Sequence, residues 1–459
     1  MGIFNALTTA VGGLQAQSFA LQNISGNIAN SQTTGFKRTD TSFANLVADS
    51  SSAQQVSGGV QALSRATNTV QGDIQAASVS TFMAINGDGY FAVQKPSGFP
   101  DNQPVFAGNE LYTRRGDFQM DKDGYLVNGT GYYLEGLPID PSTGNVTGSV
   151  PQVLKITNDF LPAQATTTIN YRANLAATPT TAQSAAGGSE LLDPADYDPA
   201  GDPRATPTGD GIVLGSDEST FESQTITGGS ITVYDAQGNP VDVQLRWAKL
   251  DSIAAGGTDT WELFYQSNTN PAATDTAWTN AGTVFNFDAN GQMNPQVANL
   301  TLTGLTVDNH TVGDIVMNFG GNGITQFADQ NGVAQVGTLN QNGFAAGQLN
   351  GISVSDKGRI VASYSNGRTL DIAEIPLVSF NGDNGLQALD GGAFQATDES
   401  GPALFGASGK IAAQSLEGSN TDISDEFTKL IVTQQAYAAN TKIVTTANDM
   451  LQETIAMLR

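Results

Sequence analysis

The chain has 459 residues, with 44 acidic against 19 basic side chains and a formal charge of −25. Phosphate backbones and anionic membrane surfaces would repel such a chain, so nucleic acid and membrane insertion are not expected. There is no cysteine and only one histidine, which excludes disulfides, thiolate nucleophiles and cysteine-based zinc sites. We therefore expect neither an enzyme nor a cofactor or metal site.

The first segment carries apolar residues at seven-residue spacing, which is one seam of a coiled coil. No charged residue occurs before Lys37, so this predicted helix should meet neighbours on several sides. The segment also lacks the positively charged n-region of a secretory signal peptide. The predicted seam residues are Phe4, Leu7, Val11, Leu14, Leu21 and Ile28.

The last segment repeats this pattern over residues 423–458. Ser424, followed by Asp425 and Glu426, predicts the helix start, with a capping side chain and acidic residues in the first turn. The predicted seam residues of this helix are Ile423, Phe427, Leu430, Tyr437, Val444, Leu451, Ile455 and Leu458.

Each stripe alone is also compatible with an amphipathic helix that docks on the core of its own domain. The same 3.5-residue period at both ends favours helices that pair with each other. At about 1.5 Å per residue, the two helices would span roughly 42 Å and roughly 54 Å, more than the width of a small domain. We expect them to project as a stalk.

Between the ends, turn sequences between apolar runs predict antiparallel β structure. Asn86–Gly89 and Asp121–Gly124 each separate two short strands, and residues 230–247 alternate around Gly238. Residues 352–375 are typical of three strands with two turns. The stretch 176–211 shows neither periodicity, which predicts a long exposed loop. Residues 156–350 hold twenty acidic and four basic residues, so this part should face solvent.

Possible sites have simpler interpretations. Asp121–Gly124 begins like a calcium loop but lacks the later ligands, so a hairpin turn is favoured. Gly320–Gly323 lacks the lysine of a phosphate loop, and His310 is most simply a loop residue. Nothing singles out a carboxylate pair for glycoside hydrolysis.

Both termini resemble the bacterial flagellar rod and hook family. At the N-terminal side the resemblance lies in Ala29–Lys37, where Thr34 replaces the family's usual proline. At the C-terminal side it lies in residues 415–422 and 426–440, with Gln435 where arginine is commoner and Thr421 where valine is commoner. The signature residues are Asn30, Gly35, Phe36, Lys37, Glu417, Ser419, Asn420, Gln434, Ala436, Tyr437 and Asn440.

The resemblance implies a multidomain α+β structural subunit of the hook, with paired coiled-coil terminal helices and nested, discontinuous, mainly antiparallel β domains. The expected parts are an inner coiled-coil domain (1–36 plus 420–459), connecting segments (37–75 plus 400–419), a middle β domain (76–150 plus 340–399) and an inserted outer β domain (151–339) with the exposed loop 176–211.

The resemblance also implies a place and partners. Many copies would polymerise into a short curved tube, a universal joint that transmits motor torque to the filament. The subunit would be extracellular, exported through the flagellar type III apparatus, and would contact rod, hook-cap and hook–filament junction proteins. Alternatives are a distal rod or junction protein and, from another class, a secreted β-rich adhesin with an exposed aromatic platform. Trp247, Trp261 and Trp278 are the candidates for that platform, although core packing is the favoured interpretation of these three residues.

We predict that the terminal segments are largely disordered in an isolated monomer and fold when copies pack together, because one narrow seam buries little apolar surface. Amide hydrogen exchange should therefore show weak protection in 1–36 and 420–459 of dilute monomer. Strong protection of both segments at that dilution would contradict the prediction.

Overall fold

The computed structural model describes the chain except residues 1–2, 52–53, 142, 198–200, 206–207 and 458–459. The described part is mostly β structure with few helices. It divides into two compact units, one formed by residues 1–159 and 349–459 and the other by residues 160–348. The second unit overlaps the inserted outer domain that we predicted at 151–339, and the domain assignment itself stays a prediction.

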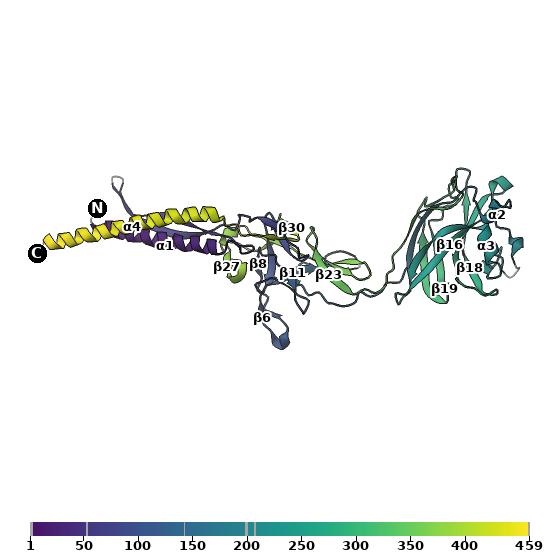
Figure 1. Cartoon of the computed structure of the whole chain (residues 1–459), viewed down its shortest axis with the longest axis horizontal. Coiled ribbons are helices and arrows are strands. Elements are labelled where there is room, and N and C mark those ends of the chain that lie inside the picture. Colours follow the sequence, from purple (N-terminus) through teal and green to yellow (C-terminus); the bar gives the residue numbers. More distant parts are fainter. Residues whose placement is uncertain (1–2, 52–53, 142, 198–200, 206–207, 458–459) are drawn as a thin grey trace. The chain divides into compact units, whose positions relative to one another are not determined.

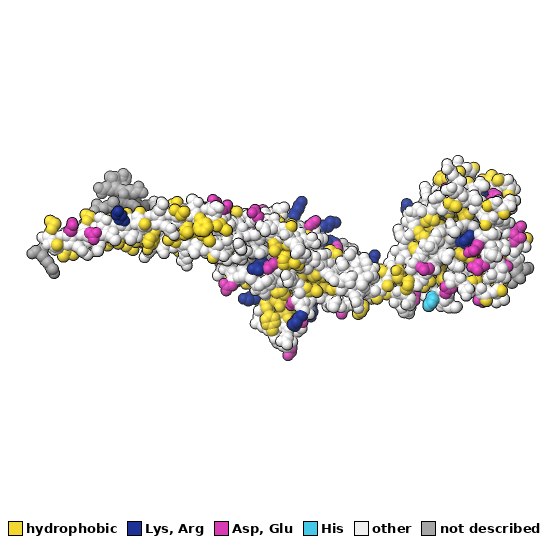
Figure 2. All heavy atoms as spheres, viewed as in Figure 1, with side chains coloured by type: hydrophobic (Ala, Val, Ile, Leu, Met, Phe, Trp, Pro, Cys, Tyr) yellow, Lys and Arg dark blue, Asp and Glu magenta, His cyan; other side chains and the backbone are white. Residues whose placement is uncertain are grey.

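Two long helices lie side by side in the first unit (Figure 1): α1 (Ile3–Ala29) and α4 (Ile423–Met457). The start of α4 differs from the prediction. The Asp422 carboxylate accepts hydrogen bonds from the backbone N–H groups of Ser424 and Asp425, at 2.8 and 3.3 Å, so Asp422 caps the helix instead of Ser424. Yellow hydrophobic side chains remain on the surface of this helix pair (Figure 2).

A long hairpin follows α1, where only connecting chain was expected. Strands β1 (Thr39–Ser51) and β2 (Gln54–Ala66) pair antiparallel from Thr39 opposite Ala66 outward. Asn23 of α1 donates a hydrogen bond to Thr41 of β1, which attaches the hairpin to the helix.

The middle part of the first unit is built around a 13-stranded sheet. Its main path runs β23 (Leu349–Val354), β24 (Arg359–Tyr364), β25 (Thr369–Glu374), β11 (Tyr133–Pro138), β5 (Tyr90–Gln94), β8 (Leu111–Thr113), β28 (Ala393–Gln395), β27 (Gln387–Leu389). The strands off this path are β9 (Gln119–Met120), β10 (Leu126–Val127), β12 (Gln152–Val153), β26 (Leu377–Ser379) and β29 (Leu404–Phe405). Three small pairs complete it: β3 (Ile74–Ala76) with β31 (Ser415–Glu417), β4 (Met83–Asn86) with β30 (Lys410–Ala413), and β6 (Pro96–Gly98) with β7 (Val105–Phe106).

Two of the predicted turns have different outcomes in this sheet. Strands β9 and β10 pair across Asp121–Gly124, and Asp121 accepts hydrogen bonds from the N–H groups of Asp123 and Tyr125, so the hairpin is confirmed. The prediction of a hairpin at Asn86–Gly89 is wrong. Strand β4 pairs with β30 and β5 pairs with β8, β11 and β26, because partners from distant sequence outcompete the local turn. The three strands predicted between 352 and 375 are β23, β24 and β25.

The second unit is a sandwich of two five-stranded sheets. One contains β19 (Asn299–Val307), β20 (His310–Asn318), β13 (Thr168–Asn174), β21 (Ile324–Thr325) and β22 (Gln335–Gln341). The other runs β14 (Ile212–Leu214), β18 (Thr276–Phe287), β17 (Asp259–Gln266), β16 (Pro240–Asp251), β15 (Ile226–Tyr234), with the predicted hairpin around Gly238 joining β15 and β16. Short helices α2 (Ala182–Ala185) and α3 (Glu218–Gln224) lie in the connections.

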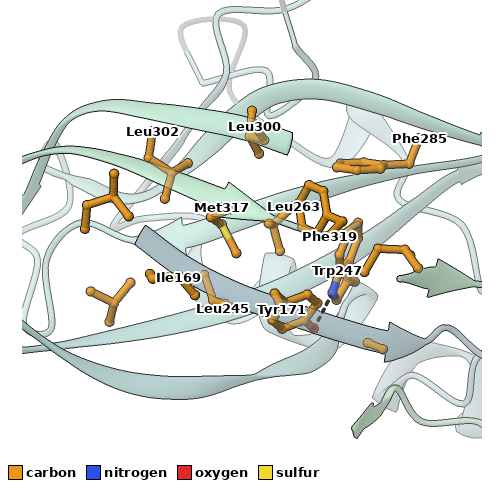
Figure 3. Packing of buried hydrophobic residues seen from close by; sticks show 14 of the residues in the cluster. Ile169, Tyr171, Leu245, Trp247, Leu263, Phe285, Leu300, Leu302, Met317 and Phe319 are labelled. Atoms are coloured by element: carbon orange, nitrogen blue, oxygen red, sulfur yellow. Dashed lines mark hydrogen bonds between the residues drawn. The ribbon is translucent and has the colours of Figure 1, made fainter. Parts of the chain in front are cut away.

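Buried aromatic residues fill the space between the two sheets (Figure 3). The Trp247 indole N–H donates to the Tyr171 hydroxyl at 2.9 Å, and that hydroxyl donates to the carbonyl of Gly228. Trp247, Trp261 and Trp278 are all 0% exposed. The exposed aromatic platform that the adhesin alternative requires is therefore not formed by these three residues.

The stretch 176–211 is only partly the exposed loop that we predicted. Its described residues have little regular secondary structure, but Leu192 and Tyr197 are buried against Phe221 and Trp278 in a second cluster on the outer side of the sheet that contains β14 and β15. The expected exposure is wrong at these residues, because aperiodic sequence identifies irregular backbone and not burial.

Glu135 of β11 is a buried acid in the first unit, only 2% exposed. Burial raises the pKa of its carboxyl to about 7; the Gln94 amide, which donates to Glu135, lowers this pKa, and the charge of Glu110 raises it. A proton is thus bound more tightly in the folded than in the unfolded chain, whose glutamate pKa is 4.5. The stability that the protonated Glu135 carboxyl contributes is fully present below pH 4.5 and is lost as pH rises through about 7.

We predict that Glu135→Gln stabilises the first unit by about 3 kcal/mol at pH 8.5 and has little effect near pH 4.5, since glutamine keeps the acceptor for Gln94 but carries no charge. Urea unfolding of variant and wild type at both pH values measures the difference. An equal difference at the two pH values would contradict the assignment.

We also predict that a fragment of residues 160–348 folds alone, because its core is contained within the unit. Tryptophan fluorescence should be blue-shifted and should change cooperatively with urea. A matched fragment of residues 176–348 lacks β13, which lies between β20 and β22, and should not fold.

Candidate assembly interface

Most of the buried positions of α1 and α4 carry small residues. On α1 the buried positions are Ala10, Gly13, Ala16, Ala20, Ile24 and Asn27. A methyl group at Gly13 would lie 3.0 Å from the Asn440 amide nitrogen, so glycine allows the helices to approach closely here. On α4 the buried positions Glu426, Thr433 and Ala447 fall on a seven-residue repeat.

The predicted seam residues therefore lie around this contact and not at its centre. Those that are half-buried are Leu7, Leu14, Leu21, Ile28, Leu430, Val444 and Leu451. Those that are exposed are Phe4, Val11, Ile423, Phe427, Tyr437 and Ile455. Leu458 lies outside the described residues. Their role in assembly remains a prediction.

Further large apolar side chains on α4 point to solvent, and the seven-residue pattern did not identify them. Ile431 is 55% exposed and Val432 is 60% exposed. Ile443 and Met450, together with Ala6, Ala439 and Ala447, line an apolar groove between the two helices. The exposed apolar residues of α1 and α4 form what we call the helix-pair surface: Phe4, Val11, Ile423, Phe427, Ile431, Val432, Tyr437, Ile443, Met450, Ile455 and Met457. So many exposed large apolar side chains on one pair of helices are typical of an interaction site.

A buried ion pair joins the N-terminal and C-terminal segments below the helices. The Lys37 ammonium donates to Glu417 Oε1 at 2.6 Å and to the Val70 carbonyl at 2.7 Å, and both side chains are almost fully buried. Arg114 Nη1 lies 3.3 Å from Glu417 Oε2. Burial lowers the pKa of Lys37, and the adjacent Glu417 carboxylate opposes that shift.

Backbone contacts between the two signature segments surround this pair. The Gly35 N–H donates to the Glu417 carbonyl at 2.8 Å, and the Asn420 N–H donates to the Phe36 carbonyl at 3.2 Å. The Asn420 side chain accepts from Arg38 N–H at 2.7 Å. Gly35 has φ +68°, and a side chain there would meet the backbone of Arg115 at 2.9 Å. Only glycine fits without strain.

A second polar cluster fixes the start of α4 against α1. The Asn27 amide donates to the buried Glu426 carboxylate at 3.1 Å. Lys429 lies 2.9 Å from Glu426 and 3.1 Å from Asp40 of the hairpin. Sequence reasoning missed these contacts, although Asn27 interrupts a series of otherwise small or apolar buried positions on α1.

The structure thus brings together Gly35, Phe36, Lys37, Glu417 and Asn420. Asn30 lies beside them in the turn that ends α1, where its amide donates to the Gly26 carbonyl, and the Ser419 hydroxyl accepts from Thr421 N–H. The remaining signature residues, Gln434, Ala436, Tyr437 and Asn440, lie along α4 away from this junction.

Other kinds of site are not indicated within the residues that the structure describes. No group of three or more His, Cys, Asp or Glu side chains there is placed to hold a metal ion. None of the described helices is long and apolar enough to cross a membrane.

Four family models match the chain in sequence order. They are the flagella basal body rod protein (7–37), the flagellar hook protein FlgE/F/G D1 domain (84–170), the flagellar basal body protein FlaE D2 domain (204–344) and the flagellar basal body rod FlgEFG protein C-terminal region (412–457).

Relatives match over the whole length. The flagellar hook protein FlgE of Brucella suis is 29% identical over 100% of both chains, and that of Salmonella typhimurium is 28% identical over 99% of this chain and 100% of its own. A crystal structure of Helicobacter pylori flagellar hook protein FlgE2 aligns with a TM-score of 0.49 and 16% identity, covering 75% of this chain and 100% of that one. The chain belongs to the flagellar hook protein family and is a structural subunit of the hook, not an enzyme.

Proposed function

We propose that copies of this chain polymerise through their terminal helices into a short curved tube, which acts as a flexible joint transmitting motor torque to the filament. The observation that carries the proposal is the helix-pair surface, whose large apolar residues contact little of their own chain. Covering these side chains with another surface would lower the free energy by about 25 cal/mol for each Å² of apolar area removed from water.

The arrangement of the helices suggests how this surface is covered. Small residues bring α1 and α4 close together, so the large side chains point outward toward neighbours. In the polymer we expect residues 1–36 and 420–459 to form an inner coiled-coil layer. The middle β domain would surround it, and the inserted domain predicted at 151–339 would lie outermost.

Torque transmission requires that the helices do not slip relative to the β structure of the same subunit. The buried Lys37–Glu417 pair and the hydrogen bonds of Gly35 and Asn420 supply that attachment. Removing Glu417 would leave the Lys37 ammonium buried without its counter-charge, and breaking a buried pair in this way costs about 3–5 kcal/mol.

The location follows from family membership, whereas the specific partners are part of the proposal. The subunit belongs in the bacterial flagellum. We further propose that it leaves the cell through the flagellar type III export apparatus and contacts rod, hook-cap and hook–filament junction proteins at the ends of the tube.

We predict that Ile455→Asp or Phe427→Asp blocks polymerisation and leaves the monomer's thermal stability nearly unchanged, within about 0.5 kcal/mol, because both side chains are exposed in one chain. Sedimentation and electron microscopy of concentrated protein measure assembly. Gln452→Asp introduces the same charge at an exposed polar position of α4 and serves as the control. Normal tubes from both apolar-site variants would refute the proposed role of the helix-pair surface.

A further inference from the structure

The two outer faces of the sandwich in the second unit differ. The outer side of the β14–β15 sheet is covered by its own chain, where Leu192, Tyr197 and Phe221 pack over Phe264 and Trp278. On the other sheet, alternate residues such as Ile169, Leu300, Leu302 and Met317 point into the core (Figure 3). The residues between them point outward and are exposed.

Four asparagines stand in register across this second face. Asn299 of β19 is opposite Asn318 of β20, Asn318 is opposite Asn170 of β13, and Asn170 is opposite Asn340 of β22. All four are exposed. We call the outward side of β19, β20, β13 and β22 the asparagine face.

Hydrogen bonds along the row fix the orientation of its amides. The Asn170 amide donates to the Asn340 side-chain oxygen at 2.9 Å, and the Asn318 amide donates to the Asn170 oxygen at 3.3 Å. Each amide has two donors and two acceptor lone pairs, so the row still offers hydrogen-bonding capacity outward. Such a surface suits a water-containing polar contact whose partners can exchange hydrogen bonds.

Charge distinguishes this face from the rest of the unit. Residues 160–348 contain 19 acidic and 4 basic side chains, so copies of the unit repel one another. In the four strands, which the structure describes in full, the charged residues besides His310 are Asp314 and Arg172, one of each sign. A neighbouring copy can therefore approach this face without meeting a concentration of negative charge on it.

We propose that the asparagine face is the surface through which second units of neighbouring copies contact each other in the polymer. The inference rests on the proposed function, because it assumes that copies assemble. A neutral amide surface gives weak, exchangeable contacts, which a tube needs where its subunits shift during bending.

The cysteine-free sequence allows a direct test, since a single introduced cysteine is the only thiol. Asn340→Cys should react with a maleimide rapidly in monomer and several-fold more slowly in assembled tubes. Ala254→Cys, exposed on the opposite sheet's β16–β17 connection, serves as the control and should react equally fast in both states. Equal reactivity of Asn340→Cys in monomer and tube, or equal protection of both sites, would overturn the proposal.

Added charge gives a second readout. The double variant Asn299→Asp/Asn340→Asp keeps the side-chain oxygens but adds two negative charges to the face. The critical concentration for tube formation should rise about two- to tenfold at low salt, an effect that 1 M salt should largely remove. The control variant Gln237→Glu/Asn270→Asp adds the same charge at exposed turns and should raise the critical concentration less. Identical behaviour of the two variants would overturn the proposal.

Failure of the proposed function has a different signature, because wild-type protein would then form no tubes at all. The competing ligand for a flat amide face is a neutral polysaccharide. If soluble cellohexaose protects the thiol of Asn340→Cys in the monomer, and tube formation does not protect it, the face binds glycan and the proposal is wrong.

Discussion

The close approach of α1 and α4 constrains the rest of the structure. Most of the buried apolar positions on the two helices carry alanine or glycine, with Ile24 as a larger residue among them, so most of the large apolar side chains of α1 and α4 stay partly or fully exposed. A helix pair of this kind cannot bury its apolar surface within one chain. If copies cover this surface as we propose, assembly would stabilise the subunit in the way that ligand binding stabilises a folded state.

The junction below the helices shows why both ends of the sequence must cooperate. Lys37 and Glu417 are 380 residues apart but form one buried pair, and the backbone contacts of Gly35 and Asn420 lie around it. Neither segment could satisfy these groups alone. The family signature is thus largely a junction between the chain ends, while its α4 portion, including Tyr437, is available to neighbours.

Periodicity and turn chemistry predicted the elements that depend on local sequence. The extents of α1 and α4, the hairpin at Asp121–Gly124 and the β23–β25 strands all followed from short-range patterns. Strand partners chosen from distant sequence did not, as β4 and β5 show. A seven-residue apolar repeat identified both helices but not their facing surfaces, because small residues at Gly13 and Ala16 carry no hydrophobic signal. The Lys37–Glu417 pair could be located from the signature, whereas Arg114 and Asn27 could not.

The two units solve opposite problems with the same chain. In the first, the exposed apolar side chains on α1 and α4 would favour association in the proposed polymer. In the second, a high negative charge opposes association, and the uncharged row of Asn299, Asn318, Asn170 and Asn340 is where we propose that copies meet. Strong inner contacts fix the position of each subunit, and weak outer contacts can then break and re-form without loss of the tube. A flexible joint needs both, because uniformly strong contacts would make it rigid and uniformly weak ones would let it come apart under torque.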